Sequence, residues 1–109
     1  MKKYLIITGI KIFLTPLFSQ VIINEYSASN LTGYTDNYEM EEDWIELYNT
    51  GEFSVDLGGY YLSDDADNPT KWVIPNGIII QSYDYLTFWC SGRDEFSGGN
   101  YHTNFKLKQ

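Results

Sequence analysis

The sequence predicts an all-β domain, and two observations carry this prediction. Apolar residues do not recur at the 3.6-residue period of a helix, whereas short runs that alternate apolar and polar residues follow one another along the chain. Turn-forming residues bound these runs at intervals of about 8–12 residues. Short, evenly spaced strands of this kind are typical of an immunoglobulin-like β-sandwich. The chain has 109 residues, which is enough for one such domain.

The first expected strands lie on either side of a long polar segment. Residues 21–28 (VIINEYSA) form one strand, and residues 29–42 form a polar loop. Residues 44–49 (WIELYN) form the next strand. Because side chains alternate across a strand, Ile45 and Leu47 are expected to share one face, and the residues between and beside them the other.

Shorter strands are expected in the second half of the chain. Phe53, Val55 and Leu57 alternate as in a short strand, and a pair of glycines then marks a bend or bulge. Residues 91–102 (SGRDEFSGGNYH) are rich in turn formers, so a loop is expected there. The other strands are expected at residues 60–63, 71–74, 78–81, 85–90 and 103–107.

The N-terminal residues have the composition of a secretory signal peptide. Two lysines open the segment, residues 4–18 are mostly apolar, and Ser19 is small enough for a cleavage site. A core helix or a membrane anchor is the alternative, but Lys11 interrupts the run, which is shorter than the roughly 20 residues of a bilayer span. We expect residues 1–19 to be removed. Residues 20–109 then form the domain of a bacterial secreted or cell-surface protein without a membrane span.

Removal of this leader makes the chain strongly acidic. Three of the seven Lys and Arg residues lie within residues 1–19, whereas all fifteen Asp and Glu residues lie after residue 20. Four cations then stand against fifteen anions, which gives a net charge of −11. Such a surface repels nucleic-acid phosphate and anionic lipid, so no nucleic-acid partner is expected. The single cysteine, Cys90, alternates with apolar residues and is expected to be a small buried side chain.

Several segments together resemble the lamin-tail domain in its bacterial secreted form. The resemblance covers residues 21–107, and its segments occur in the family's order and at about its spacing. It implies an immunoglobulin-like β-sandwich that acts as a non-catalytic interaction or adhesion module. The segments are IINEYSASN (22–30), DWIELYN (43–49), TGEFSVDLGGYYLSDD (50–65), KWVIP (71–75) and NFKL (104–107).

The resemblance also bears on what surrounds this module. In secreted bacterial proteins such domains accompany another domain, such as a nuclease, a phosphatase-like enzyme or a spore-coat-type kinase-like domain. The alternative is therefore an N-terminal accessory part of a larger extracellular hydrolase or of a spore-coat-type kinase-like protein. The family's Pro-Gly turn is replaced by QSYDY (81–85), and the family continues past NFKL with further strands. We therefore expect a domain that is incomplete at its C-terminal end and that self-associates through open sheet edges.

An enzymatic interpretation finds little in the sequence. Glu25, Asp43 and Glu46 offer carboxylates for acid–base work, but their spacing defines no partner set. Asp43 is instead expected to bound the loop, and Glu46 to lie on the less buried face of its strand. His102 is the single histidine and lies in a segment of turn residues. The chain is therefore expected not to be an enzyme.

The segment SDDADNPT (63–70) offers the hard oxygen ligands that Ca²⁺ prefers. It does not follow the EF-hand pattern, because Pro69 and Thr70 stand where that loop has a ligand and a glycine. Asp and Asn also favour turns by bonding to their own backbone, which is the alternative. No other cofactor is expected. The candidate Ca²⁺ ligands are Asp64, Asp65, Asp67 and Asn68.

Tyrosines flank the expected loops and strand ends. An exposed tyrosine in a loop suits contact with a protein or a glycan, so a protein or glycan partner at the cell surface is expected. The alternative is that several of these tyrosines cover the ends of the sandwich. They are Tyr34, Tyr38, Tyr60, Tyr61, Tyr83 and Tyr101.

Overall fold

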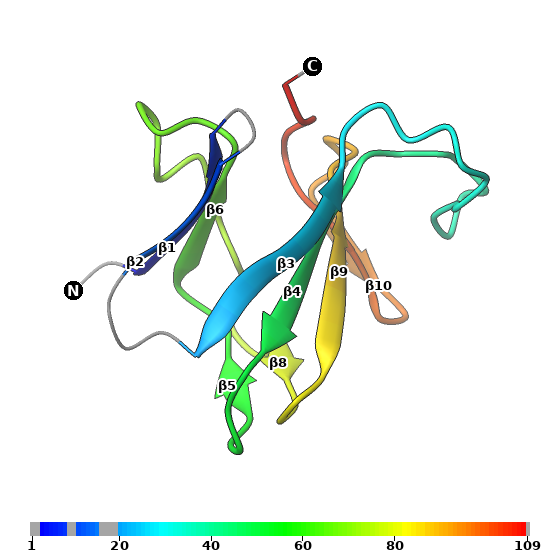
Figure 1. Ribbon diagram of the computed structural model, residues 1–109. Coiled ribbons are helices and arrows are strands. Elements are labelled where there is room, and N and C mark those ends of the chain that lie inside the picture. The colour runs from blue at the N-terminus through cyan, green and yellow to red at the C-terminus, as the bar shows by residue number, and fades with distance from the viewer. Residues whose placement is uncertain (1–2, 9–10, 16–19, 109) are drawn as a thin grey trace. The chain divides into compact units, whose positions relative to one another are not determined.

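The computed structural model describes residues 3–8, 11–15 and 20–108, and this part of the chain is built from strands and turns (Figure 1). The predicted all-β fold class is confirmed. The strands are β1 Lys3–Thr8, β2 Lys11–Thr15, β3 Val21–Ser27, β4 Trp44–Asn49, β5 Val55–Asp56, β6 Tyr60–Ser63, β7 Trp72–Val73, β8 Ile79–Ile80, β9 Tyr85–Trp89, β10 Glu95–Ser97 and β11 Asn100–His102.

These strands form three sheets. The largest has the order β10-β11-β9-β4-β3, a second has the order β2-β1-β6-β7, and β5 pairs with β8. The chain divides into two compact units, and β3, β4 and β9 run from one unit into the other. Unit 1 holds residues 1–23 and 47–86, and unit 2 holds residues 24–46 and 87–109.

In β4, the apolar residues that alternate in the sequence are the ones that are buried. Ile45 and Leu47 are completely buried, whereas Trp44, Glu46 and Tyr48 are half-buried. The predicted faces of this strand are therefore confirmed. The expected strands at residues 21–28, 44–49, 60–63 and 85–90 are β3, β4, β6 and β9, with bounds that agree to within one residue.

Unit 1 contains a buried polar residue that fixes the turn after β4. Asn49 is completely buried, and its amide donates to the carbonyl oxygen of Phe53 at 2.8 Å. Its Oδ1 accepts the N–H of Gly51 at 2.9 Å. Because this turn holds Phe53 out of the sheet, its side chain is 71% exposed, and only Val55 and Asp56 form a strand. The expected alternation of Phe53 with Val55 and Leu57 is therefore wrong at its first residue.

Unit 2 contains a hairpin where a loop was expected. Residues 91–102 include β10 and β11, which pair antiparallel. Gly98 and Gly99 connect them with φ angles of 57° and 82°, and a two-residue turn with both φ values positive suits the twist of a hairpin. β11 also pairs in parallel with β9, with Tyr101 opposite Phe88. The expected loop is thus part of the five-stranded sheet.

The last expected strand is absent from the described residues, since residues 103–107 form no ladder. The Thr103 hydroxyl donates to the carbonyl oxygen of Phe105 at 2.7 Å, so the backbone turns locally. Thr103, Phe105 and Leu107 are all buried, and the alternation seen in the sequence reflects this burial without a strand.

The expected leader coincides with β1 and β2. These two strands pair antiparallel, and β1 also runs parallel to β6 in the four-stranded sheet (Figure 1). Leu5 of β1 is completely buried. The expected cleavage site at Ser19 lies outside the described residues, and removal of the leader stays a prediction. The described part of the chain has no helix of the length and apolarity that a bilayer crossing requires.

Candidate functional site

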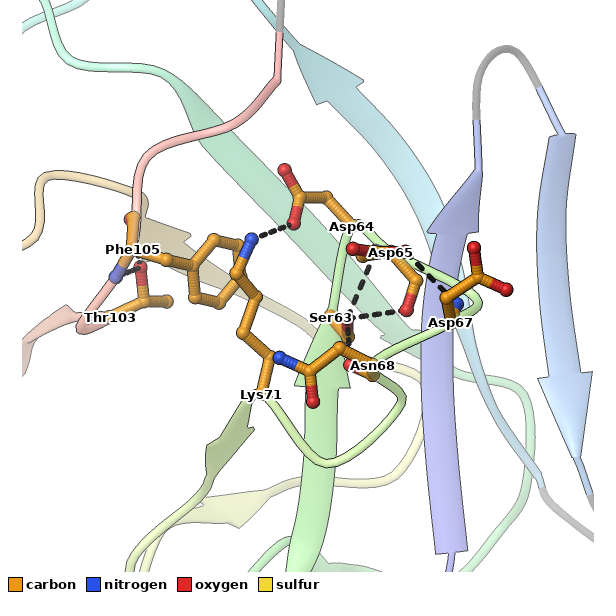
Figure 2. A network of polar contacts seen from close by, with 8 residues as sticks. All are labelled: Ser63, Asp64, Asp65, Asp67, Asn68, Lys71, Thr103 and Phe105. Atoms are coloured by element: carbon orange, nitrogen blue, oxygen red, sulfur yellow. Dashed lines mark hydrogen bonds and ion pairs between the residues drawn. The ribbon is translucent and has the colours of Figure 1, made fainter.

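The acidic segment after β6 is a tight turn built on a serine hydroxyl (Figure 2). Ser63 is completely buried, and its Oγ lies 2.7 Å from the carbonyl oxygen of Asn68 and 3.0 Å from that of Asp65. The same Oγ accepts the N–H of Asp65 at 3.0 Å. The Asp65 carboxylate in turn accepts the N–H of Asp67 at 2.9 Å. These contacts are the backbone bonds by which Asp, Asn and Ser favour turns.

Asp64, the most buried acid of this turn, has a cation partner within its own unit. Its Oδ1 lies 2.7 Å from the Nζ of Lys71. Figure 2 marks this ion pair with a dashed line. The four residues expected to bind Ca²⁺ thus lie in one turn, where Asp64 and Asp65 also hold protein groups. Within residues 3–8, 11–15 and 20–108, no group of three or more His, Cys, Asp or Glu residues is arranged to hold a metal ion. A Ca²⁺ site on Asp64, Asp65, Asp67 and Asn68 therefore stays a prediction.

Thermal unfolding tests the Ca²⁺ site. A ligand that binds the folded chain raises its melting temperature, so millimolar Ca²⁺ is expected to raise Tm relative to EDTA. Asp65→Ala combined with Asp67→Ala is expected to remove this rise. Glu52→Ala, which removes an exposed acid outside the turn, is the matched control and should keep it. Superimposable melting curves in Ca²⁺ and in EDTA would rule the site out.

The long loop between β3 and β4, in unit 2, is the second candidate, and two buried polar residues hold it. The first is Asn30, which is 3% exposed. Its amide donates to the carbonyl oxygens of Tyr34 at 2.8 Å and Glu42 at 3.0 Å. Its Oδ1 accepts the N–H and the hydroxyl of Thr32 at 3.2 and 2.7 Å. The N–H of Asn30 donates to the Asp43 carboxylate at 3.0 Å, so Asp43 bounds the loop as expected.

Asn30 also opens Asn-Leu-Thr, the acceptor pattern for N-glycosylation. Both hydrogens of its side-chain amide are used by Tyr34 and Glu42. A glycan on this nitrogen would replace at least one of these bonds. The pattern therefore matches a structural asparagine that closes the loop.

The second buried residue of the loop is Asp36, which is 7% exposed. Its Oδ1 accepts the N–H groups of Tyr38 at 2.8 Å and Met40 at 3.0 Å. The backbone of Asp36 also bonds to Met40 and Glu39, and Glu39 takes a left-handed conformation with φ of 61°. A carboxylate that accepts two backbone N–H groups stabilises such a turn. The tip of the loop is thus held in one conformation.

This ordered loop displays large apolar side chains to solvent. We call the set the loop patch. Exposed apolar groups mark contact surfaces where they lie together on a protein, and these side chains all come from residues 31–40. Because the backbone is already held by Asn30 and Asp36, a partner would not have to order it. The members of the loop patch are Leu31, 85% exposed, Tyr34, 47%, Tyr38, 43%, and Met40, 50%.

Tyr34 is held from one side by two tryptophans of unit 2. Its ring centroid lies 4.9 Å from that of Trp89 and 5.8 Å from that of Trp44, the latter in an edge-on arrangement. Aromatic pairs favour such offset and edge-on geometries. One face of Tyr34 is therefore fixed by packing, while about half of the residue stays available to a partner.

A buried histidine anchors the loop next to Tyr38. His102 is completely buried, and its Nδ1 lies 2.8 Å from the hydroxyl of Ser91. Its Nε2 lies 2.7 Å from Oδ1 of Asn37 in the loop. Since an amide oxygen only accepts, Nε2 carries a proton and donates to Asn37. The two ring nitrogens of His102 thus join the loop to the segment after β9.

Tyr38 packs between an acid and a base of unit 2. Its hydroxyl donates to the Glu95 carboxylate, and the guanidinium carbon of Arg93 lies 4.0 Å from its ring centroid. The hydrogen bond to Glu95 and the negative charge of that carboxylate raise the pKa of the Tyr38 hydroxyl above its ordinary value. The phenol therefore stays neutral around pH 7 and remains a hydrogen-bond donor.

The structure separates the tyrosines that the sequence grouped together. Tyr34, Tyr38 and Tyr83 are exposed, as a contact role requires, whereas Tyr61 and Tyr101 are half-buried. Tyr60 is 5% exposed and belongs to the core. Leu31 and Met40, which are more exposed than most of these tyrosines, were not expected in the site, because nothing in a polar loop sequence shows which apolar side chains point outward.

Most of the residues weighed for catalysis make contacts within unit 2. The Glu46 carboxylate accepts a bond from Asn24 at 2.9 Å, and Glu25 is exposed. Cys90 is completely buried, as expected, and its N–H donates to the carbonyl oxygen of Asp43 at 2.7 Å. His102 is buried between Ser91 and Asn37 and is not presented to solvent. Glu46, Cys90 and His102 thus take part in contacts within unit 2.

In the part of the chain that the structure describes, the regular elements are all strands, which is the class of an all-β domain. A family model described as Lamin Tail Domain matches residues 16–109. The chain therefore belongs to the lamin tail domain family, as its sequence segments led us to expect. Searches of curated proteins and of solved structures found no match.

Proposed function

We propose that this chain is a non-catalytic interaction module of a secreted or cell-surface bacterial protein. Its contact surface is the loop patch of unit 2, and its partner is a protein or a glycan at the cell surface. The observation that carries the proposal is the combination of order and exposure in the β3–β4 loop. Asn30 and Asp36 fix the backbone, and Leu31, Tyr34, Tyr38 and Met40 face solvent.

The chemistry of the loop patch suits a surface that binds without reacting. Tyrosine and methionine are enriched in interfaces, where tyrosine offers a large apolar face and a polar hydroxyl. The neutral Tyr38 hydroxyl and the nearby Arg93 add polar contacts at the rim. Binding energy in such interfaces concentrates in a few large side chains. We expect Leu31, Tyr34 and Met40 to supply most of it.

The absence of an enzymatic role belongs to the same proposal. A nucleophile or general base must reach its substrate, and His102 is completely buried and paired at both ring nitrogens. Ser91, whose hydroxyl His102 contacts, is 7% exposed. The geometry around Ser91 and His102 therefore supports an anchoring role for the pair.

Secretion and the choice of partner are also part of the proposal. The basic start, apolar stretch and small residue within residues 1–19 support their removal as a signal peptide. The remaining chain has a net charge of −11, which disfavours binding to nucleic acid. The fifteen acids favour partners that are neutral or basic.

Binding to intact bacterial cells tests the loop patch. Leu31→Ser combined with Met40→Ser is expected to lower the binding of dye-labelled protein to these cells by about tenfold or more, because two exposed apolar anchors are lost. Phe53→Ser removes an apolar side chain of unit 1 that is 71% exposed, a fraction between those of Met40 and Leu31, and should leave binding unchanged. Prior treatment of the cells with protease or with periodate separates a protein partner from a glycan. Equal binding by the double variant and the parent protein would contradict the proposal.

A further inference from the structure

In unit 1, β6 has a neighbouring strand on each side, and one of these two strands comes from the segment before the family match. β7 pairs antiparallel with one side of β6, and β1 pairs in parallel with the other. The register places Lys3 opposite Tyr60 and Ile6 opposite Ser63, so β1 covers the whole of β6 (Figure 1). The family match begins at residue 16, after β1 and β2. The strand that fills this edge therefore comes from the segment with leader composition.

Burial shows that this pairing extends to the side chains. Leu5 lies opposite Leu62 in the register, and both are completely buried. Residues paired across neighbouring strands project from the same face of the sheet, so Leu5 extends the buried face to which Leu62 belongs. Ser63, at the end of β6, is also completely buried. β1 thus contributes both a backbone ladder and the buried side chain of Leu5 to the edge of β6.

The charges of the chain favour a basic strand at this edge of β6. Residues 1–19 contain three lysines and no acid, whereas the rest of the chain has a net charge of −11. The turn that follows β6 contains Asp64, Asp65 and Asp67, and the lysine at that end of the β1–β2 pair is Lys11, which pairs with Thr8, whereas Lys3 lies opposite Tyr60 at the start of β6. A basic strand is therefore attracted to this edge, and an acidic one is repelled.

We propose that the edge of β6 is a strand-binding site for a basic, apolar, extended segment of a partner protein. The segment Lys3–Thr8 fills this site within the chain until residues 1–19 are removed. Removal would leave the N–H and C=O groups on one side of β6 without a ladder, and an open edge pairs readily with an added strand. The step from the internal strand to a partner rests on the proposed removal of the leader. The site itself rests on β1, β6 and the burial of Leu5.

Specific cleavage of the chain after residue 19 tests whether β1 stays paired with β6. A protease recognition sequence is inserted between residues 19 and 20 of the full chain, and the purified protein is cut. We expect residues 1–19 to co-elute with the remainder in size exclusion, since the β1–β6 pairing persists. Leu5→Asp is expected to release the cut segment, whereas Leu31→Asp makes the same change at an 85% exposed leucine and should retain it.

Peptide exchange tests the partner, and it varies the ligand while the protein stays unchanged. A dye-labelled peptide of residues 2–15 is expected to exchange into the cut protein and to raise its fluorescence anisotropy. Leu5→Asp in the peptide should weaken binding by about tenfold or more, because a buried leucine is lost. Replacement of its three lysines by glutamate should weaken binding further as salt is lowered.

Two results decide between the site and its absence. One result is that residues 20–109 dimerise once residues 1–19 are released and return to a monomer when the peptide is added. This result supports the strand-binding site, since a second copy of the chain had then occupied the edge of β6. A cut segment that leaves with no change in Tm, together with a peptide that causes no anisotropy change, overturns the proposal. These outcomes do not depend on leader removal in the cell or on the loop patch, so they fail or succeed separately from the proposed function.

Discussion

Phe88→Ala is expected to destabilise the chain by about 3–5 kcal/mol, the usual cost of removing a buried phenylalanine. Phe88 lies in β9 and is completely buried, with its ring centroid 5.8 Å from that of Tyr101. Domains of this size are stable by about 5–15 kcal/mol, so this single change removes a large share of that stability. Thermal unfolding should show a drop in Tm of more than about 10 °C.

Phe53→Ala is the matched control, because it makes the same truncation at a phenylalanine that is 71% exposed. Its effect on the free energy of unfolding is expected to stay within about 0.5 kcal/mol. Comparable losses at Phe88 and Phe53 would contradict the burial on which the description of unit 2 depends.

Asn30→Ala is expected to cost about 2–3 kcal/mol and to disorder the β3–β4 loop. The substitution leaves the carbonyl oxygens of Tyr34 and Glu42 and the N–H of Thr32 without the side chain that bonds them. Buried groups that lose a partner cost about 1–3 kcal/mol each, and water that enters the loosened loop recovers part of this cost. Urea unfolding measures the loss as a lower midpoint at an unchanged slope.

Two variants sharpen this test. Asn30→Asp keeps the Oδ1 acceptor for Thr32 but places a buried carboxylate, which cannot donate, against the carbonyl oxygens of Tyr34 and Glu42, so its cost should equal or exceed that of Asn30→Ala. Thr35→Ala changes an exposed residue of the same loop and should be neutral within about 0.5 kcal/mol. An Asn30→Ala chain as stable as Thr35→Ala would show that Asn30 does not hold the loop.

Strands with a regular alternation could be predicted from the sequence, because one side of each is buried. In β4, Ile45 and Leu47 alternate with larger or polar residues over six positions, and both are completely buried. The strand needs no information beyond this period of two. Phe53 shows where the period misleads. Phe53 fits the alternating pattern but is not in the sheet, because Asn49, four positions earlier, bonds its carbonyl oxygen and holds it in a turn.

The β10–β11 hairpin could have been found from a local signal. Gly98-Gly99 is a pair that accepts two positive φ angles in succession, which a two-residue hairpin turn requires. The flanking strands have only three residues each, so they show no alternation long enough to detect. At residues 103–107, the sequence predicts a strand and none forms. Buried residues alternate there, but Thr103 bonds locally to Phe105.

The candidate site was only partly accessible to sequence reasoning. The tyrosines of the long loop suggested a contact role, and Tyr34 and Tyr38 are exposed. The buried residues that order this loop, Asn30 and Asp36, resemble any polar loop residues in the sequence. Asn30 bonds to the Asp43 carboxylate and to the carbonyl oxygen of Glu42, twelve residues away, whereas Asp36 bonds to backbone groups within four residues. Such non-local bonds have no pattern that a single sequence displays.

The central claim is that the loop patch is displayed on a backbone held by buried side chains, and amide hydrogen exchange tests it most directly. The N–H groups of Tyr38 and Met40 both donate to Asp36, and that of Thr32 donates to Asn30. In the full chain at neutral pH, these three amides are expected to exchange at least about tenfold more slowly than their sequence alone dictates. Exchange of all three at the rate of an unstructured peptide would contradict the claim, since the patch would then lie on a disordered loop.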